Sequence, residues 1–175
     1  MRSIGVISDT HGLLRPEALA ALSGVEQIVH AGDIGSEEIL TALGCLAPVT
    51  AVRGNNDRDP WAHRIEERAV LEIDGYRLLV LHDLNELGRS EGYAAVISGH
   101  SHRPRIERRD GVLFLNPGSA GPRRFSLPIS VAILRISPTG LEAELRELNP
   151  AHDPREPRPR AARKSGRSSS SRRAR

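Results

Sequence analysis

The chain is poor in cysteine and in long apolar runs. Its single cysteine, Cys45, cannot form an intramolecular disulfide, which fits a reducing compartment, and its apolar neighbours predict that it packs in the core. No stretch approaches the ~20 apolar residues of a membrane span. The N-terminal apolar run is broken by Ser8 and Asp9 and is too short for a secretory signal. We therefore expect a cytoplasmic protein with no membrane contact.

Aromatic residues are equally scarce. Two Phe, two Tyr and one Trp in 175 residues leave Leu, Val, Ile and Ala to build the core. The net charge of +3 is unevenly spread, because residues 151–175 hold nine Lys and Arg against two acids, so the first 150 residues carry −4. A mildly acidic body does not favour nucleic acid as its main ligand, and any such attraction must come from the tail.

The composition divides the chain into two parts. Residues 1–149 have the length and apolar content of one globular domain. Residues 150–175 are rich in Arg, Pro and Ser and almost free of apolar residues, so they cannot bury enough surface to offset the entropy of ordering. We predict one domain followed by a disordered basic tail.

Short apolar runs bounded by turn residues predict the strands. In the first half they alternate with helical patterns over residues 16–22 and 36–46, where Ser36 is the expected N-cap, which gives a βαβαβ order. In the second half, Asp74-Gly75 and Asp110-Gly111 join strand pairs as hairpin turns. The pattern predicts an α/β protein with two packed sheets flanked by helices. The strands are expected at 3–7, 27–30, 49–52, 70–73, 76–81, 94–97, 105–109, 112–115, 129–136 and 141–148.

Polar side chains that can bind metals follow five of these strands. In an open α/β sheet, ligands bind at the carboxyl ends of the strands. Residues two apart in an extended chain point the same way, so Asp9 with His11, and His100 with His102, can each aim at one point. The full set of candidate metal ligands is Asp9, His11, Asp33, Asn55, His82, His100 and His102.

Each motif alone has an ordinary structural explanation. Asp9 can cap a helix, and the segment around Asp33 can be a simple turn. Paired histidines after an apolar strand have fewer structural uses, so residues 99–102 are more specific. Five such motifs, all at strand ends, favour a metal site. His30 lies inside an apolar strand and is expected to face the core or to support Asp33, not to bind metal.

These motifs resemble the calcineurin-like metallophosphoesterase superfamily. The resemblance rests on Asp9-x-His11, Gly32-Asp33, Gly54-Asn55-x-Asp57, His82 and Gly99-His100-x-His102. The segments 116–119 and 122–123 look like those of its YfcE-type phosphodiesterase branch. The match covers about residues 3–147 and implies a four-layer fold, two mixed β-sheets between helices.

The resemblance also implies a mechanism, in which a phosphodiesterase cleaves a small phosphate ester by attack of a metal-bridging hydroxide. It assigns Asp33 as a bridge between two divalent ions. Mixed carboxylate, amide and imidazole ligands suit Mn²⁺, with Ni²⁺, Co²⁺, Zn²⁺ or Fe as alternatives. One ion is assigned to Asp9, His11 and His102, and the other to Asn55, His82 and His100.

Two positions depart from the family pattern. Asn56 stands where many members have a histidine that protonates the leaving oxygen, although the YfcE-type branch commonly lacks it. Asp83 replaces the usual glycine after His82, and it could tighten metal binding, restrict the pocket or point to solvent. Asn55 and Arg123 are the candidates for contact with the substrate phosphate.

Two other functions compete with hydrolysis. The same fold resembles the retromer subunit vacuolar protein sorting 29, a scaffold, but a scaffold has no chemical need to keep seven competent ligands. The basic tail permits weak contact with polyanions or nucleic acid, and the domain could then act on a nucleic-acid diester. The sequence leaves open the natural substrate, the native metal and the oligomeric state.

Overall fold

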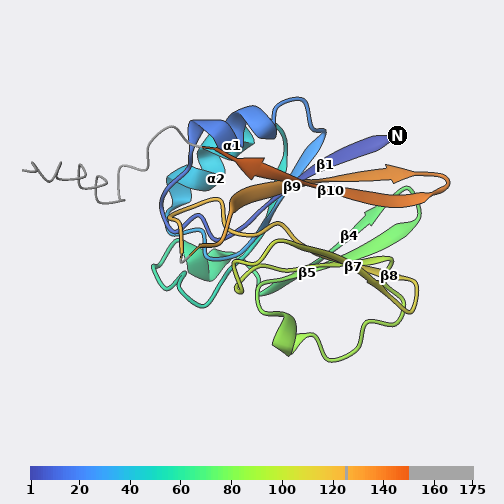
Figure 1. Cartoon of the computed structure of the whole chain (residues 1–175). Helices are drawn as coiled ribbons and strands as arrows, with labels where there is room; N and C mark the ends of the chain where they lie inside the picture. Colours follow the sequence, from blue (N-terminus) through green and yellow to red (C-terminus); the bar gives the residue numbers. More distant parts are fainter. Residues whose placement is uncertain (125, 150–175) are drawn as a thin grey trace, which may run out of the picture.

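The computed structural model describes residues 1–124 and 126–149 and contains two five-stranded mixed sheets (Figure 1). The first has the order β10-β9-β1-β2-β3. Strands β1, β2 and β3 are parallel to one another. Strand β9 pairs antiparallel with β1 on the other side, and β10 pairs antiparallel with β9. Their bounds are β1 Arg2–Ile7, β2 Gln27–Ala31, β3 Val49–Val52, β9 Ile129–Ser137 and β10 Gly140–Leu148.

The second sheet has the order β4-β5-β6-β8-β7. Strands β5, β6 and β8 run parallel at its centre, and β4 and β7 are antiparallel edge strands. The bounds are β4 Arg68–Ile73, β5 Tyr76–Leu81, β6 Ala95–Ile97, β7 Arg105–Arg109 and β8 Val112–Asn116. The predicted hairpin turns join their strands as expected, with left-handed φ angles of 51° at Asp74 and 49° at Asp110.

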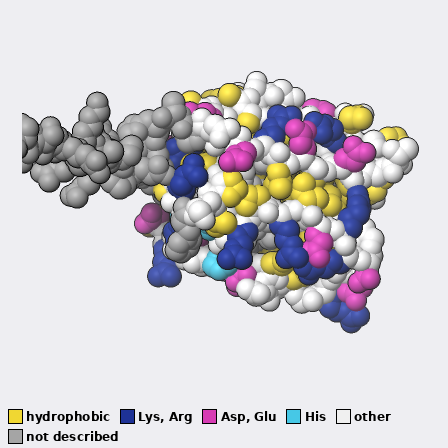
Figure 2. Space-filling model, in the orientation of Figure 1, with side chains coloured by type: hydrophobic (Ala, Val, Ile, Leu, Met, Phe, Trp, Pro, Cys, Tyr) yellow, Lys and Arg dark blue, Asp and Glu magenta, His cyan; other side chains and the backbone are white. Residues whose placement is uncertain are grey.

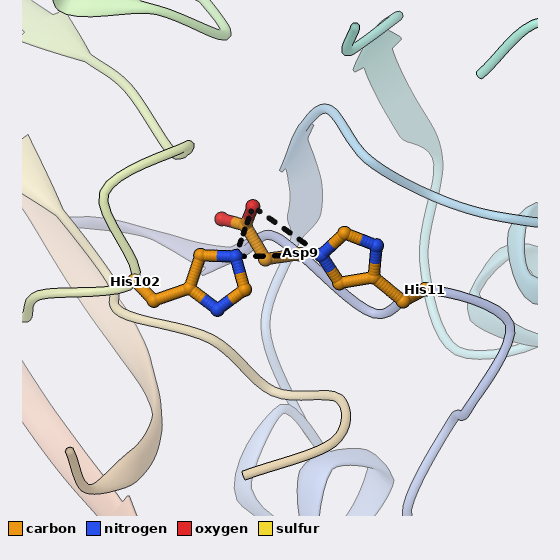
Figure 3. A group of neighbouring side chains, drawn as sticks. All are labelled: Asp9, His11 and His102. Atoms are coloured by element: carbon orange, nitrogen blue, oxygen red, sulfur yellow. Dashed lines mark hydrogen bonds and ion pairs between the residues drawn. The ribbon is translucent and has the colours of Figure 1, made fainter. Parts of the chain in front are cut away.

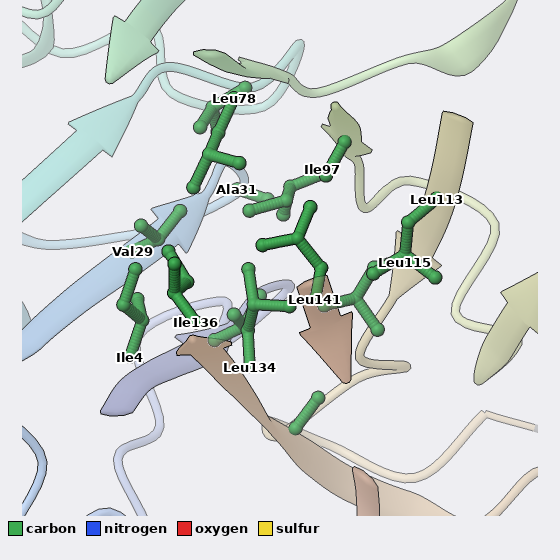
Figure 4. Packing of buried hydrophobic residues seen from close by; sticks show 14 of the residues in the cluster. Ile4, Val29, Ala31, Leu78, Ile97, Leu113, Leu115, Leu134, Ile136 and Leu141 are labelled. Atoms are coloured by element: carbon green, nitrogen blue, oxygen red, sulfur yellow. The ribbon is translucent and has the colours of Figure 1, made fainter. Parts of the chain in front are cut away.

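The main core lies between the two sheets (Figure 4). Alternate residues of each strand point into it, as the period of two requires. In β1, Ile4 and Val6 face this core, whereas Ile7 packs on the other side of the sheet. The aliphatic core predicted from the lack of aromatic residues is therefore observed between the sheets.

The outer faces of the two sheets are covered differently. Helices α1 (Pro16–Ala21) and α2 (Glu37–Gly44) pack on the first sheet. A 3₁₀ turn, η1 (Ala62–Arg64), follows β3. The outer face of the second sheet is covered by the 3₁₀ turn η2 (Leu84–Glu86) and the loop that continues to Tyr93. The predicted class of two packed mixed sheets flanked by helices is confirmed, with a thin outer layer on the second sheet.

At α2, the prediction that Cys45 is buried is wrong, and the prediction of Ser36 as N-cap is confirmed in position. Cys45 is exposed, because α2 buries Ile39 and Leu43 and ends at Gly44, which leaves Cys45 at the C-cap outside the buried stripe. Ser36 occupies the N-cap position, but its side chain makes no capping hydrogen bond. Helix α1 ends one residue before the predicted boundary.

Within the described part of the chain, no helix is long and apolar enough to cross a membrane. The predicted basic tail, residues 150–175, lies outside the described residues. The predicted metal ligands all lie within the described residues, at the strand ends of the two sheets.

Candidate metal centre

The carboxyl ends of β1, β2, β3, β5 and β6 bring the predicted ligands together. We call Asp9, His11 and His102 the inner triad (Figure 3). The Nε2 atom of His102 lies 3.2 Å from Asp9 Oδ1 and 3.3 Å from His11 Nε2. The His11 Nε2 atom lies 3.9 Å from Asp9 Oδ1. Three donor atoms from two distant loops thus point at one small volume.

Asp33 lies beside this triad and connects it to His82. The Asp33 Oδ2 atom is 3.8 Å from His11 Nε2 and 3.3 Å from His82 Nε2. One ligand atom each of Asp9, Asp33 and His82 also lies within 4.8 Å of the others. This position between two groups of donors suits the predicted bridging role of Asp33.

The remaining two predicted ligands lie at the open side. Together with His82 they form what we call the outer triad: Asn55, His82 and His100. Asn55 Oδ1 is 3.1 Å from His100 Nδ1, and the His82 and His100 rings meet edge to face at 5.2 Å. The His100 side chain is 42% exposed, against 8% for His102.

Unpartnered buried atoms show that the donor set fits divalent cations. His82 Nδ1 lies 2.7 Å from the Ala31 carbonyl, to which only an N–H can donate, so Nε2 carries the lone pair of the neutral ring. His82 Nε2 and Asp9 Oδ1 are both buried and lack a hydrogen-bond partner among the described residues. Buried acceptors without donors are costly, and a bound cation satisfies them.

The pKa values of this cluster show how a proton substitutes for a cation. Burial lowers the pKa of His82, but the nearby Asp33 carboxylate and the Ala31 carbonyl outweigh it and raise the value to about 9. Burial likewise opposes the charge on Asp33, but the contacts with His82 and Asn56 hold its pKa well below the usual range. Burial lowers the pKa of His11. Metal binding must displace the proton of His82, so acid weakens it.

The backbone at the centre is held in unusual conformations. Five of the seven predicted ligands adopt left-handed φ angles, which cost about 1 kcal/mol or more in residues other than glycine. They are Asp9 (54°), His11 (46°), Asp33 (53°), His100 (64°) and His102 (57°). Close packing adds a glycine requirement, because a Cβ on Gly54 would lie 2.2 Å from Asp33 Oδ1.

Two supporting residues were not predicted from the sequence. The buried carboxylate of Asp57 accepts hydrogen bonds from the backbone N–H groups of Ile34, Gly35 and Gly54 at 3.1, 2.9 and 2.8 Å, which ties the loop after β2 to the loop after β3. Asn56 donates to Asp33 twice, from Nδ2 at 2.6 Å and from its backbone at 2.9 Å. The sequence showed Asp57 only as part of the motif with Gly54 and Asn55, and Asn56 only as a departure from the family, so neither supporting role was visible.

His30 faces the core, which is one of the two positions predicted for it, and its hydrogen bond is to Thr10, not to Asp33. The Thr10 hydroxyl donates to the Ile34 carbonyl at 2.8 Å and therefore accepts from His30 Nε2 at 2.9 Å. His30 is fully buried, and burial lowers its pKa to about 3. It holds Thr10, which lies between two inner ligands, and does not itself reach the metal donors.

The departures and substrate candidates lie around the open side. Asp83 Oδ1 caps η2 by accepting from the Asn85 N–H at 2.9 Å, and its Oδ2 lies 3.8 Å from His100 Nε2. Arg53, which also lies near the open side, pairs with the local acid Glu67. Arg123 is exposed and donates to the Leu127 carbonyl at 3.4 Å, whereas the charge of Arg124 acts on His11.

Comparisons with known proteins agree on one family. Residues 1–139 match the family described as the calcineurin-like phosphoesterase superfamily domain. A probable metallophosphoesterase from Methanothermobacter thermautotrophicus is 41% identical over an alignment that covers 81% of this chain and 90% of the relative.

Solved structures show the same fold. One described as a novel archaeal phosphodiesterase has a TM-score of 0.68 at 27% identity, covering 82% of this chain and 99% of that one. YfcE, a phosphoesterase from E. coli, has a TM-score of 0.61 at 22% identity, covering 76% and 88%. Vps29 from Entamoeba histolytica, complexed with Zn²⁺, has a TM-score of 0.66 at 20% identity, covering 84% and 99%.

Proposed function

Because the chain belongs to the calcineurin-like phosphoesterase superfamily, we propose that it is a two-metal phosphodiesterase acting on a small phosphate ester. One observation carries the proposal: two buried, unpartnered donor atoms, Asp9 Oδ1 and His82 Nε2, converge with Asp33 at the strand ends. The archaeal phosphodiesterase structure, at 27% identity, supports diesters over other phosphate esters.

The residues divide the work of holding the ions. We propose that the inner triad holds one ion, the outer triad holds the other and Asp33 bridges them. When bound, the two ions supply an activated water and positive charge for the phosphoryl oxygens. The Ala31 carbonyl fixes the His82 tautomer so that Nε2 faces the site. Asn56 holds both Asp33 oxygens and thereby sets the direction of the bridge.

The site offers no imidazole at position 56 to protonate the leaving group. The Asn56 amide is an N–H donor without an acidic proton, and it is committed to Asp33. The leaving oxygen therefore departs unprotonated or takes its proton from water. We propose that Asn55 and Arg123 contact the substrate phosphate, and the charge of Arg124 beside His11 adds to the same attraction.

We propose Mn²⁺ as the native ion, because the mixed donor set suits it. We also propose that the protein is cytoplasmic. We further propose that residues 151–175 contact polyanions weakly, because nine basic residues attract phosphates in a salt-dependent way. Deletion of residues 151–175 should leave turnover of a small diester unchanged.

The deciding experiment is turnover by metal-stripped protein after each divalent ion is added back. We expect hydrolysis of bis(4-nitrophenyl) phosphate above that of 4-nitrophenyl phosphate, with Mn²⁺ most effective. His63→Ala is a matched control, because His63 is exposed and outside the centre. Full activity after exhaustive chelation would contradict the proposal.

Metal binding alone does not separate an enzyme from a scaffold. The Vps29 structure named above is itself complexed with Zn²⁺. Binding of two ions without turnover of any diester would therefore favour the scaffold alternative. Turnover that depends on the ion and disappears when a ligand is replaced would exclude it.

A further inference from the structure

A cavity on the outer face of the second sheet adjoins the metal centre. We call it the side pocket; it has a volume of about 250 Å³ and lies between η2, the loop after β6, and strands β7 and β8. A neighbouring cavity of about 210 Å³ opens onto the outer triad. Both cavities are lined by Asp83 and His100. A ligand can therefore reach from the outer triad into the side pocket past this pair.

The inner wall of the side pocket includes an aromatic and an aliphatic side chain. It is lined by Phe114 of β8 and by Leu84 of η2. The Arg109 guanidinium lies 5.0 Å from the centre of the Phe114 ring. Aromatic rings and guanidinium planes are the surfaces on which nucleobases stack. The wall thus suits a planar heteroaromatic group.

The rim of the side pocket is rich in arginine. Arg103, Arg105 and Arg109 all line it, and Figure 2 shows basic side chains, with acidic ones among them, near β7 and β8. Glu107 pairs with Arg105 and with Arg109, the latter at 2.8 Å. Exposed pairs of this kind are weak and exchange readily for a stronger anion.

Arg103 is the cation that the pocket leaves available. No ion pair or side-chain hydrogen bond joins its guanidinium to any residue in 1–124 or 126–149, and it follows His102 directly. Such a guanidinium can bind a phosphate group in a forked, two-bond arrangement. The rim therefore suits an anion beside the planar group.

We propose that the side pocket binds the arm of the diester that is not expelled, and that this arm is a nucleotide: a base against Phe114 and a second phosphate at Arg103. The inference rests on the proposed function, because it places the scissile phosphate at the outer triad. The pocket is smaller than the roughly 300–1,000 Å³ of drug-sized ligand sites, which favours a single nucleotide over a polymer.

Three substrates with one leaving group test this. Phenyl 4-nitrophenyl phosphate, the 4-nitrophenyl ester of thymidine 5′-phosphate, and the same ester with a 3′-phosphate all release 4-nitrophenolate. We expect kcat/KM to rise in that order, by about tenfold for the added phosphate, the worth of one charge-assisted contact. Equal kcat/KM values for the three substrates would overturn the inference.

Variants locate the effect. In Arg103→Gln, the ratio of kcat/KM for the 3′-phosphate substrate to that for the phenyl diester should fall about tenfold. Arg89→Gln is the matched control, because Arg89 is an exposed arginine paired with Glu91 outside the pocket. Phe114→Leu, which keeps an apolar wall, should reduce the preference for the thymidine arm over phenyl. An unchanged ratio in Arg103→Gln would overturn the assignment.

A binding measurement separates this inference from the proposed function. Titration of thymidine 3′,5′-bisphosphate into the metal-free full chain by calorimetry needs no turnover. Affinity that falls in Arg103→Gln but not in Arg89→Gln supports the pocket even if no diester is hydrolysed, in which case the proposed function fails. Hydrolysis of all three diesters with binding that ignores Arg103 supports the function and overturns the pocket.

Discussion

The inner and outer triads differ in how far the fold prepares them for an ion. Asp9 is fully buried and His102 nearly so, and all three inner residues have left-handed backbones. In the outer triad, Asn55 is exposed, His100 is 42% exposed, and only His100 has a left-handed backbone. The comparison indicates that the fold positions the inner triad before an ion binds, whereas the outer triad is completed by the ion and substrate that it binds.

Backbone hydrogen bonds anchor both triads, so the difference between them lies in burial and backbone conformation. The Asp9 and His11 N–H groups donate to the carbonyls of Gly32 and Asp33, each at 3.0 Å, and the Gly121 N–H donates to the Asp9 carbonyl at 3.2 Å. In the outer triad, the Gly99 N–H donates to the His82 carbonyl at 3.0 Å, the His100 N–H donates to Asp9 Oδ2 at 3.1 Å, and His82 Nδ1 contacts the Ala31 carbonyl. Because Asn55 and His100 are exposed and the inner triad is more buried, we expect tight ion binding at the inner triad and ion exchange at the outer triad.

Replacement of Asp33, which lies between the two triads, should remove the difference in ion binding between them. Because Asp33 lies between both groups, Asp33→Ala should reduce turnover to below about one thousandth and weaken both ions. Turnover, metal content and circular dichroism on the same sample check this. Full activity in a folded Asp33→Ala protein would refute the two-metal assignment.

The open outer side should also show in leaving-group dependence. Without a histidine at position 56, alkyl diesters should be cleaved slower than aryl diesters beyond their intrinsic difference, by up to the ~10²–10⁴-fold typical of a general acid. A series of substituted aryl diesters measures the slope of rate against leaving-group pKa. Asn56→His should flatten that slope. A rate independent of leaving-group pKa, with chemistry rate-limiting, would point to another acid.

In the metal-free protein, acid should remove stability at the inner triad, and base should remove stability at the outer triad. The His30 pKa falls to about 3 from 6.5, so its neutral form supports the inner triad above pH 6.5, and this stability is lost as pH falls toward 3. The effect is on the order of a few kcal/mol. The His82 pKa rises to about 9, so its contribution is full below pH 6.5 and disappears as pH rises through 9.

Urea unfolding of metal-free protein between pH 4 and 9 measures both effects. The acid loss should be absent in His30→Gln and present in His63→Gln, which changes an exposed histidine. The alkaline loss should be absent in His82→Gln. Identical pH profiles for His30→Gln and wild type would show that His30 does not support the inner triad.

Removal of one histidine from each triad sharpens the contrast. His102→Ala should weaken the tighter ion by at least about a hundredfold, whereas His100→Ala should weaken only the other ion, by about tenfold. Calorimetric titration with Mn²⁺ gives both affinities, and His63→Ala is the control. Equal losses at both ions in both variants would mean that the halves are not distinct.

The smallest expected effect concerns Asp83. Asn at this position keeps the cap on η2 but removes the charge that lies 3.8 Å from His100 Nε2. Asp83→Asn should weaken the outer ion by less than about tenfold, because the carboxylate only orients a ligand. An effect as large as that of His100→Ala would make Asp83 a ligand itself.

The fold was predictable because strand ends and turns carry local signals. Asp-Gly pairs located both hairpins of the second sheet, and apolar runs located the strands. The prediction that Cys45 is buried was wrong, because an apolar run does not show where α2 ends. The end of the helix decides which residues turn outward. The thin layer over the second sheet depends on tertiary packing and left no local pattern.

The site was predictable in composition but not in its supports. The structure brings Asp9, His11 and His102 together, as their strand-end positions indicated, and their role as ligands stays a prediction. The contacts of Asp57 and Asn56 join loops far apart in sequence, so no local pattern reveals them. The side pocket likewise needs β6, β7, β8 and η2 in place before it exists.

The left-handed backbones of the five predicted ligands cost thermodynamic stability at the positions where the proposed function needs side chains. Glycine adopts these φ angles freely, so replacing any of the five ligands with glycine relieves backbone strain at the moment it removes a donor. A lineage released from selection for turnover can therefore drift toward greater stability by losing exactly these side chains. A fold whose reactive residues are its strained ones has an easy evolutionary route from enzyme to inert framework.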